Sequence, residues 1–178
     1  PTNLTNNPLD DQNVPSIGEP RIAATGGNRF VLAWHREQWE SGGSLNDIYY
    51  AVRDTNGGEI KPVTRFTSDT PGSDQSYHYP ALAQLNGDRA LLAWSQTVSG
   101  VGDTAYAILD SSGDVVKSTT TLGRNGSGLD AAQLSNGRVL IAWTFEETTN
   151  PQMSFALLEA NSYNLVAGPT SLDNPASP

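Results

Sequence analysis

The chain has 178 residues, a net charge of −9, 37% hydrophobic residues and no cysteine. This length fits one domain with a substantial core, and the absence of cysteine excludes disulfides, zinc–thiolate sites and thiol catalysis. The 10 Lys and Arg residues are scattered, which excludes a nucleic-acid partner, and no apolar run is long enough to span a membrane.

The polar N-terminal segment comes first along the chain. Its TNLTNN stretch parallels the segments around Phe66 and Leu122, so residues 1–8 are expected to form the outer strand of a preceding repeat. Asp10 and Asp11, in the following PLDDQN stretch, are weak candidates for a calcium site. The 17 Gly and 11 Pro residues favour short strands joined by turns over long helices.

A motif of Arg, three apolar residues, Ala and Trp then occurs three times, ending at Trp34, Trp94 and Trp143. A short strand and a Gly/Asn turn precede each motif, and a third strand, a tight turn and a fourth strand follow it. The predicted repeats are four-stranded, antiparallel and cover about residues 16–68, 76–123 and 128–174. Because the motif is apolar over five consecutive positions, its strand is expected to be covered on both faces.

These units resemble the blades of a β-propeller, and most closely the repeats of secreted or periplasmic bacterial propellers of the sialidase-like or PD40-like type. The sialidase Asp-box, Ser-x-Asp-x-Gly-x-x-Trp, has no match in the sequence, so the resemblance assigns no catalytic residue. It implies an all-β propeller segment that further blades complete, supplied by the same parent chain or by another copy. A β-trefoil, which also has three four-stranded repeats, is the alternative fold.

Two connections are longer than their counterparts, HREQWESGGSLND after Trp34 and SDTPGSDQSYHY before Pro80. In a propeller blade these two kinds of connection emerge on the same face, and variable loops on a repeated scaffold are common binding sites. We therefore expect a carbohydrate or protein ligand on this face. The candidate ligand-binding residues are His35, Trp39, Asp47, Tyr77, His78 and Tyr79.

The sequence says less about the chemistry of the protein than about its fold. Glu37, Glu40 and Asp47 are weak catalytic candidates, because two carboxylates flanking a sugar would make a glycosidase. The two histidines lack a third metal ligand, and the segments that begin at Asp54 and Asp110 favour hairpin turns over calcium loops, so neither a metal nor a cofactor is expected. The sequence predicts a secreted or envelope-associated binding or scaffolding module. The alternatives are a glycoside-processing enzyme and an assembly unit of a larger propeller.

Overall fold

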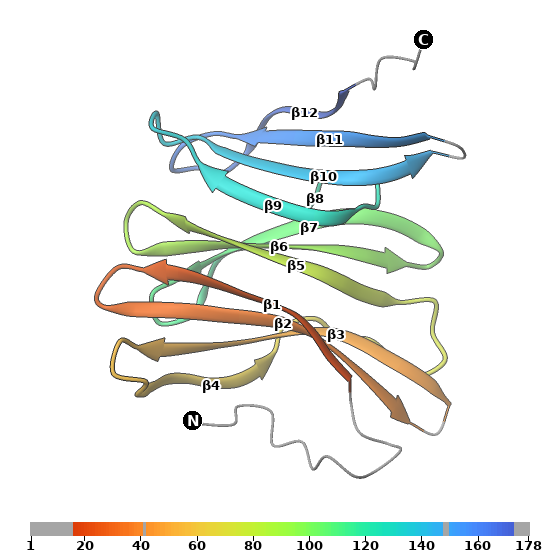
Figure 1. Cartoon of the computed structure of the whole chain (residues 1–178), viewed down its shortest axis with the longest axis horizontal. Helices are drawn as coiled ribbons and strands as arrows, with labels where there is room; N and C mark the ends of the chain where they lie inside the picture. The colour runs from red at the N-terminus through yellow and green to blue at the C-terminus, as the bar shows by residue number, and fades with distance from the viewer. Residues whose placement is uncertain (1–15, 41, 148–149, 173–178) are drawn as a thin grey trace.

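The structure is a computed structural model that describes residues 16–40, 42–147 and 150–172. It contains three four-stranded antiparallel sheets stacked on one another, each with its strands in sequence order (Figure 1). The sheets, here called blades 1, 2 and 3, consist of β1 (Ser16–Thr25), β2 (Arg29–Glu40), β3 (Gly43–Asp54) and β4 (Glu59–Arg65); β5 (Ser76–Leu85), β6 (Arg89–Val98), β7 (Val101–Asp110) and β8 (Val115–Thr121); and β9 (Ser127–Gln133), β10 (Val139–Glu147), β11 (Asn150–Leu158) and β12 (Leu165–Leu172).

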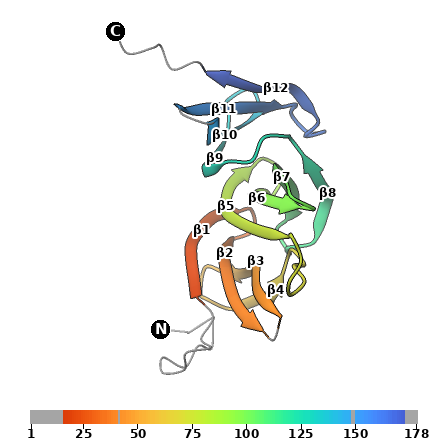
Figure 2. The same ribbon diagram turned by 90° about the vertical axis from the view of Figure 1, so that its right-hand side faces the viewer.

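The arrangement is that of propeller blades. The first strands β1, β5 and β9 contact one another in succession, while β4 and β8 lie on the opposite side of the stack (Figure 2). The predicted all-β propeller fold is confirmed, and the self-closing β-trefoil is not adopted. The predicted strand around Leu4 lies outside the described residues. No helix that could cross a membrane occurs in the described part of the chain.

Tight turns join the first two strands of blades 1 and 2. Gly27 and Asn28 have φ angles of 69° and 57°, and Gly87 and Asp88 have 72° and 59°. Thr25 pairs with Arg29 and Leu85 pairs with Arg89, so each connection has three residues, and the last two have the positive φ that Gly, Asn and Asp tolerate best. These residues therefore fix the register of the hairpin that the first two strands of each blade form.

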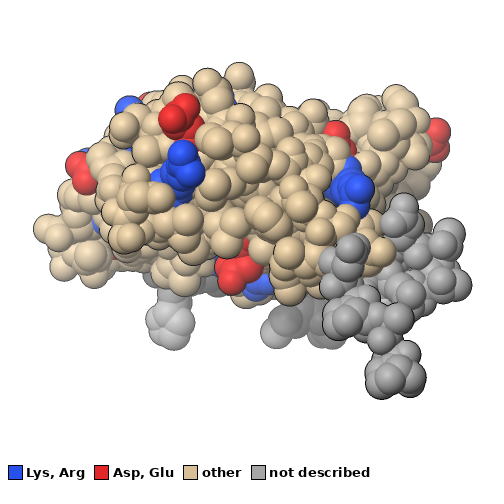
Figure 3. Space-filling model, turned by 90° about the horizontal axis from the view of Figure 1, so that it is seen from above, with Lys and Arg blue, Asp and Glu red and all other residues tan. Residues whose placement is uncertain are grey.

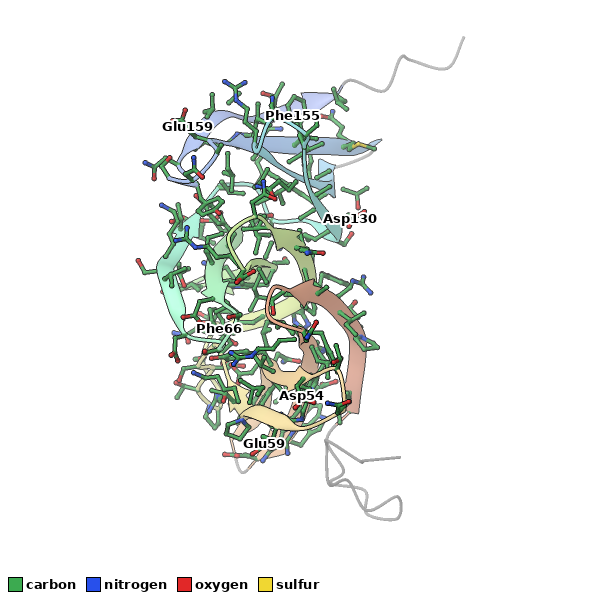
Figure 4. The ribbon with its side chains drawn as sticks, turned by 90° about the vertical axis from the view of Figure 1, so that its left-hand side faces the viewer. Asp54, Glu59, Phe66, Asp130, Phe155 and Glu159 are labelled. Carbon is green, nitrogen blue, oxygen red and sulfur yellow. The ribbon has the colours of Figure 1, made fainter. Side chains whose placement is uncertain are left out.

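The second strand of the middle blade is covered on both faces, as its continuous apolar sequence predicts. Leu91 and Ala93 belong to the core between blades 2 and 3, whereas Leu92 and Trp94 belong to the core between blades 1 and 2. Phe66, which lies between the first two blades (Figure 4), packs edge-on against Trp94, with ring centroids 5.2 Å apart. Repetition of the motif thus reflects repetition of the interface that it builds.

Polar contacts also repeat between blades. The Tyr50 hydroxyl of blade 1 donates a hydrogen bond of 2.8 Å to the carbonyl of Gly113 in blade 2. The Tyr106 hydroxyl of blade 2 donates one of 2.6 Å to the carbonyl of Tyr163 in blade 3. Each tyrosine therefore joins its blade to the turn between the third and fourth strands of the next.

The first strand of each blade carries an irregularity at the same place. The pairing register shifts between Gly18 and Arg21 in β1, between His78 and Ala81 in β5, and next to Ser127 in β9. Within these shifts Glu19, Tyr79 and Gly128 have φ angles of 58°, 54° and 60°. They are β-bulges, which add a residue to one strand and redirect its side chains.

Candidate functional site

The connections that were expected to share a face lie at one end of the stack (Figure 1). The insertion at residues 35–47, however, is not a long loop. It extends β2 and β3 as a paired hairpin whose register runs from His35 opposite Ile48 to Glu40 opposite Gly43. The two halves of the insertion can pair because Gly42 and Gly43, with φ angles of 132° and 143°, close a tight reversal.

Asp47 is only 2% exposed, and its carboxylate binds residues at the end of β4 and in the connection between β4 and β5. Its Oδ1 accepts hydrogen bonds from Thr67 Oγ1 at 2.7 Å and from the Asp69 amide at 2.9 Å. Its Oδ2 forms an ion pair with Arg65 at 2.5 Å. Asp69 in turn accepts the amide of Asn46 through its Oδ2 at 2.8 Å. This buried network anchors the connection to β3.

The two histidines, distant in sequence, meet at the junction of blades 1 and 2. The rings of His35 and His78 have centroids 4.6 Å apart, and His35 Nε2 lies 3.2 Å from Asn46 Oδ1. Burial lowers the pKa of His78 from its ordinary value of 6.5, and the neighbouring His35 lowers it further. Burial also raises the pKa of Tyr77, with Asp47 as the next cause. His78 therefore favours the neutral, hydrogen-bonding form.

A cleft of about 290 Å³ opens between blades 2 and 3, at the same end of the stack. His78 and Tyr79 contribute the start of β5, and the end of β6, which pairs with it, lies on the same side of the cleft. The connection from β8 to β9 and part of β10 complete it. The whole lining consists of His78, Tyr79, Ser95, Gln96, Thr97, Asn125, Gly126, Ser127 and Phe145.

The cleft exists because blade 3 follows blade 2 by a short connection that ends in a glycine. Counted back from the repeat tryptophans, Gly126 corresponds to Tyr77, which packs against the core between blades 1 and 2. A Cβ at Gly126 would lie 2.1 Å from Cδ1 of Trp143. At the first junction a tyrosine and a longer connection occupy this region, and at the second junction a glycine leaves it open.

Hydrogen bonds define what the cleft offers to a ligand. Trp94 Nε1 donates to Gln96 Oε1 at 3.0 Å, which leaves the NH₂ of Gln96 as its donor. The Ser95 hydroxyl donates to Asn125 Oδ1 in the same way, which leaves the NH₂ of Asn125. The Tyr79 side chain is 39% exposed. The site thus combines neutral polar groups with an accessible aromatic ring.

The remaining predicted residues are distributed as follows. Of the ligand-binding candidates, the structure brings His78 and Tyr79 into the cleft, and His35 lies against His78. Trp39, which is 60% exposed near the hairpin tip, does not line it. Glu37 accepts a hydrogen bond from Ser16 and Glu40 accepts one from Gln38, and neither lines the cleft. The catalytic role of Glu37, Glu40 and Asp47 stays a prediction.

The structure holds no cluster of metal-binding side chains among its described residues, and Asp10 and Asp11 lie outside them. Asp54 Oδ1 accepts the amides of Asn56 and Gly58, both at 2.8 Å. Asp110 makes the same contacts in blade 2. Both aspartates therefore close hairpin turns, as predicted.

Sequence reasoning missed the polar half of the cleft and the counterpart of Asp47. Asp103 Oδ1 accepts the Gly123 amide at 2.5 Å and so anchors the connection after blade 2. A signal was present, because Asp47 and Asp103 each stand three residues before the repeat tyrosine. Ser95, Thr97 and Asn125 carried no comparable signal, since only the packing of two blades brings them together.

Comparison with known proteins identifies the fold. No protein-family model matches the chain, and no curated protein matches it by sequence. Solved structures similar to it include the Hadza microbial sialidase Hz136, at a TM-score of 0.62 and 13% identity over 79% of this chain and 35% of that one. An α-L-arabinanase of Penicillium chrysogenum complexed with arabinobiose has a TM-score of 0.54 and 11% identity over 80% of this chain and 42% of the other.

An endo-arabinase of Bacteroides thetaiotaomicron VPI-5482 has a TM-score of 0.51 and 15% identity over 87% of this chain and 61% of the other. The chain therefore spans less than two thirds of the length of each of these proteins. At such identities the likeness establishes the fold alone. The chain is built from β-propeller blades like those of glycoside-acting enzymes.

Proposed function

We propose that this chain binds carbohydrate in the cleft between blades 2 and 3, as part of a glycoside-processing β-propeller. The observation that carries the proposal is the lining of the cleft, where five neutral hydroxyl or amide side chains surround an exposed tyrosine: Ser95, Gln96, Thr97, Asn125 and Ser127 around Tyr79.

Sugar hydroxyls both donate and accept hydrogen bonds, and serine, threonine and amide side chains complement them without a charge. The apolar face of a sugar ring can pack on an aromatic ring, for which Tyr79 is available. The ring of Phe145 is less suitable, because the guanidinium of Arg124 lies 4.9 Å from its centroid. A volume of about 290 Å³ lies near the lower end of the range for small-molecule pockets, roughly 300 Å³. The cleft therefore suits a short segment of a glycan.

The similar solved structures support the glycoside-processing part of the proposal, since they include a sialidase, an endo-arabinase and an arabinanase. Two carboxylates are the usual machinery of glycoside hydrolysis. None lines the cleft among the described residues. In this proposal the cleft contributes recognition, and hydrolysis would require carboxylates that lie outside the cleft. A secreted or envelope location, where polysaccharides are met, belongs to the same proposal.

Glycan-array screening followed by calorimetric titration tests this function, with arabino-oligosaccharides and sialyllactose as the first probes. Thr97→Val removes one hydroxyl at nearly constant shape and is expected to weaken binding about 2- to 10-fold, the effect of one hydrogen bond. Tyr79→Asn removes the ring but keeps a residue that tolerates positive φ. Trp39→Ala is the control, because Trp39 lies outside the cleft. Absence of glycan binding, or binding lost only in Trp39→Ala, would refute the cleft as the site.

A further inference from the structure

Asn125 and Gly126 stand next to each other in the connection from β8 to β9, and both line the cleft between blades 2 and 3. In an asparagine–glycine pair the backbone nitrogen of the glycine can attack the side-chain amide of the asparagine, because no Cβ obstructs the close approach. Asn125 is exposed, so water can reach its amide. The pair is therefore a candidate for deamidation, the loss of the side-chain nitrogen as ammonia.

Three other such pairs occur in the chain, and all of them lie in turns that join two paired strands: Asn56–Gly57, Asn86–Gly87 and Asn136–Gly137. In two of these turns a hydrogen bond restrains the glycine nitrogen. The Gly57 amide donates to the carbonyl of Asp54 at 2.9 Å, and the Gly137 amide donates to the carbonyl of Leu134 at 2.8 Å. A hydrogen-bonded amide keeps its proton and its orientation, which disfavours attack.

The Gly126 nitrogen is not restrained in this way. Before it, the connection is anchored at the carbonyl of Arg124, which accepts the Thr104 hydroxyl at 2.8 Å. After it, strand pairing begins at Ser127. Between these two anchors the amides of Asn125 and Gly126 donate no hydrogen bond to any residue that the structure describes. The Gly126 nitrogen can therefore lose its proton and turn toward the Asn125 side chain.

A hydroxyl group polarises the amide that would be attacked. Ser95, which is 4% exposed on β6, donates a hydrogen bond to Asn125 Oδ1. Attack on Cγ places negative charge on this oxygen, and a donor that is already in position stabilises such a charge. Across the described residues, no hydroxyl donates to the side chain of Asn56, Asn86 or Asn136. Asn125 alone thus combines an unrestrained nucleophile with a polarised carbonyl.

We propose that Asn125 deamidates spontaneously in the folded protein and thereby places a negative charge in the cleft. The Gly126 nitrogen loses its proton and forms a bond to Cγ of Asn125. The bond between Cγ and Nδ2 breaks, and Nδ2 leaves as ammonia with the proton that the Gly126 nitrogen lost. Water then adds to one of the two carbonyls of the cyclic imide and opens the ring, which gives aspartate or isoaspartate.

Either product changes the cleft. An amide NH₂ donates two hydrogen bonds, whereas an ionised carboxylate only accepts them. The lining contains no carboxylate among the described residues, and Figure 3, which views the molecule from the side of blade 3, shows only scattered charges there. Isoaspartate also adds a methylene group to the backbone next to Gly126, where a Cβ would already lie 2.1 Å from Cδ1 of Trp143. The reaction itself does not depend on carbohydrate binding.

Peptide mapping of the whole chain after incubation at 37 °C tests the proposal. Deamidation adds one mass unit, and fragmentation assigns it to a residue, because Asn125 and Asn136 share the tryptic peptide that ends at Arg138. Asn125 is expected to react about 10-fold faster than Asn56 and Asn136, the effect of one hydrogen bond or more. The reaction should be faster at pH 8 than at pH 6, since the attacking nitrogen must lose its proton. In denaturing urea the difference between the pairs should disappear.

Two variants test the roles of the amide and the hydroxyl. Asn125→Gln keeps an amide but requires a larger ring, so the mass gain at this position should disappear. Ser95→Ala should slow the reaction about 2- to 10-fold, the effect of one hydrogen bond, and circular dichroism confirms that this variant is folded. A folded chain in which Asn125 gains no mass, or gains it no faster than Asn56 and Asn136, overturns the proposal. So does a Ser95→Ala variant that reacts as fast as the wild type or faster.

Discussion

Replacing Gly126 with alanine tests how the cleft is built. The new Cβ would lie 2.1 Å from Cδ1 and 2.8 Å from Cγ of Trp143, and 2.7 Å from the carbonyl oxygen of Thr144. Trp143 is 1% exposed in the core between blades 2 and 3, so its ring has no free space to move into. The backbone at Gly126 is outside the positive-φ region, which makes the contact alone responsible for any effect.

The expected cost follows from these contacts. Adding a methyl group to a packed core usually costs about 1–3 kcal/mol, and a clash with both an aromatic ring and a backbone carbonyl belongs to the upper half of that range. Gly126→Ala should therefore lower the free energy of unfolding by about 2–3 kcal/mol. With a urea m-value of about 2 kcal/mol/M, the unfolding midpoint should fall by roughly 1–1.5 M.

Urea unfolding followed by tryptophan fluorescence and circular dichroism measures this shift. Gly18→Ala is the matched control, because no atom lies within 4 Å of its hypothetical Cβ and its φ is not positive. It should change the stability by less than about 0.5 kcal/mol, as surface substitutions usually do. If the two variants were equally stable, or Gly126→Ala resembled the wild type, the account of why the cleft is open would fail.

Two further predictions concern stability. Trp94→Ala should cost about 3–5 kcal/mol, because this buried ring lies between two blades, and Trp39→Ala should cost under about 1 kcal/mol; equal losses in chemical denaturation would contradict the placement of Trp39 on the surface. Burial and the neighbouring His35 lower the pKa of His78 below 6.5. Below about pH 6.5 the unfolded chain therefore binds a proton at this histidine more readily than the folded chain does, and the free energy of unfolding should fall as the pH drops. Denaturation at pH 7.5 and 5.0 should show a smaller difference for His78→Gln than for the wild type; an undiminished difference would assign the effect to other groups.

The architecture could be predicted because short segments of the sequence determine it. The apolar strand that ends at each repeat tryptophan, the turn residues such as Gly27 and Asn28, and the aspartates at Asp54 and Asp110 act within one blade. Repetition then multiplies each signal. These features indicated four-stranded units with two covered faces before any contact was known.

The candidate site was harder to predict because it depends on pairs of blades. His35 and His78 meet only because β2 and β5 lie side by side, and the cleft is open only because Gly126 takes the place of Tyr77. The hairpin that carries Trp39 was misassigned as a loop, since its polar sequence lacks the apolar alternation of an ordinary strand. A long strand pairing beyond the core has no buried face to impose that alternation.

The bulge at Tyr79 has a consequence for the chemistry of the cleft. In a regular strand adjacent side chains project to opposite faces, yet His78 and Tyr79 both line this cleft. The additional residue in β5 interrupts the alternation of side chains between the two faces of the strand. The residues after the bulge therefore pack in the core, and the first residues of the strand line the cleft. One neutral imidazole and one phenol thereby become a continuous surface, and ligand preference is expected to respond to the pair rather than to either side chain separately.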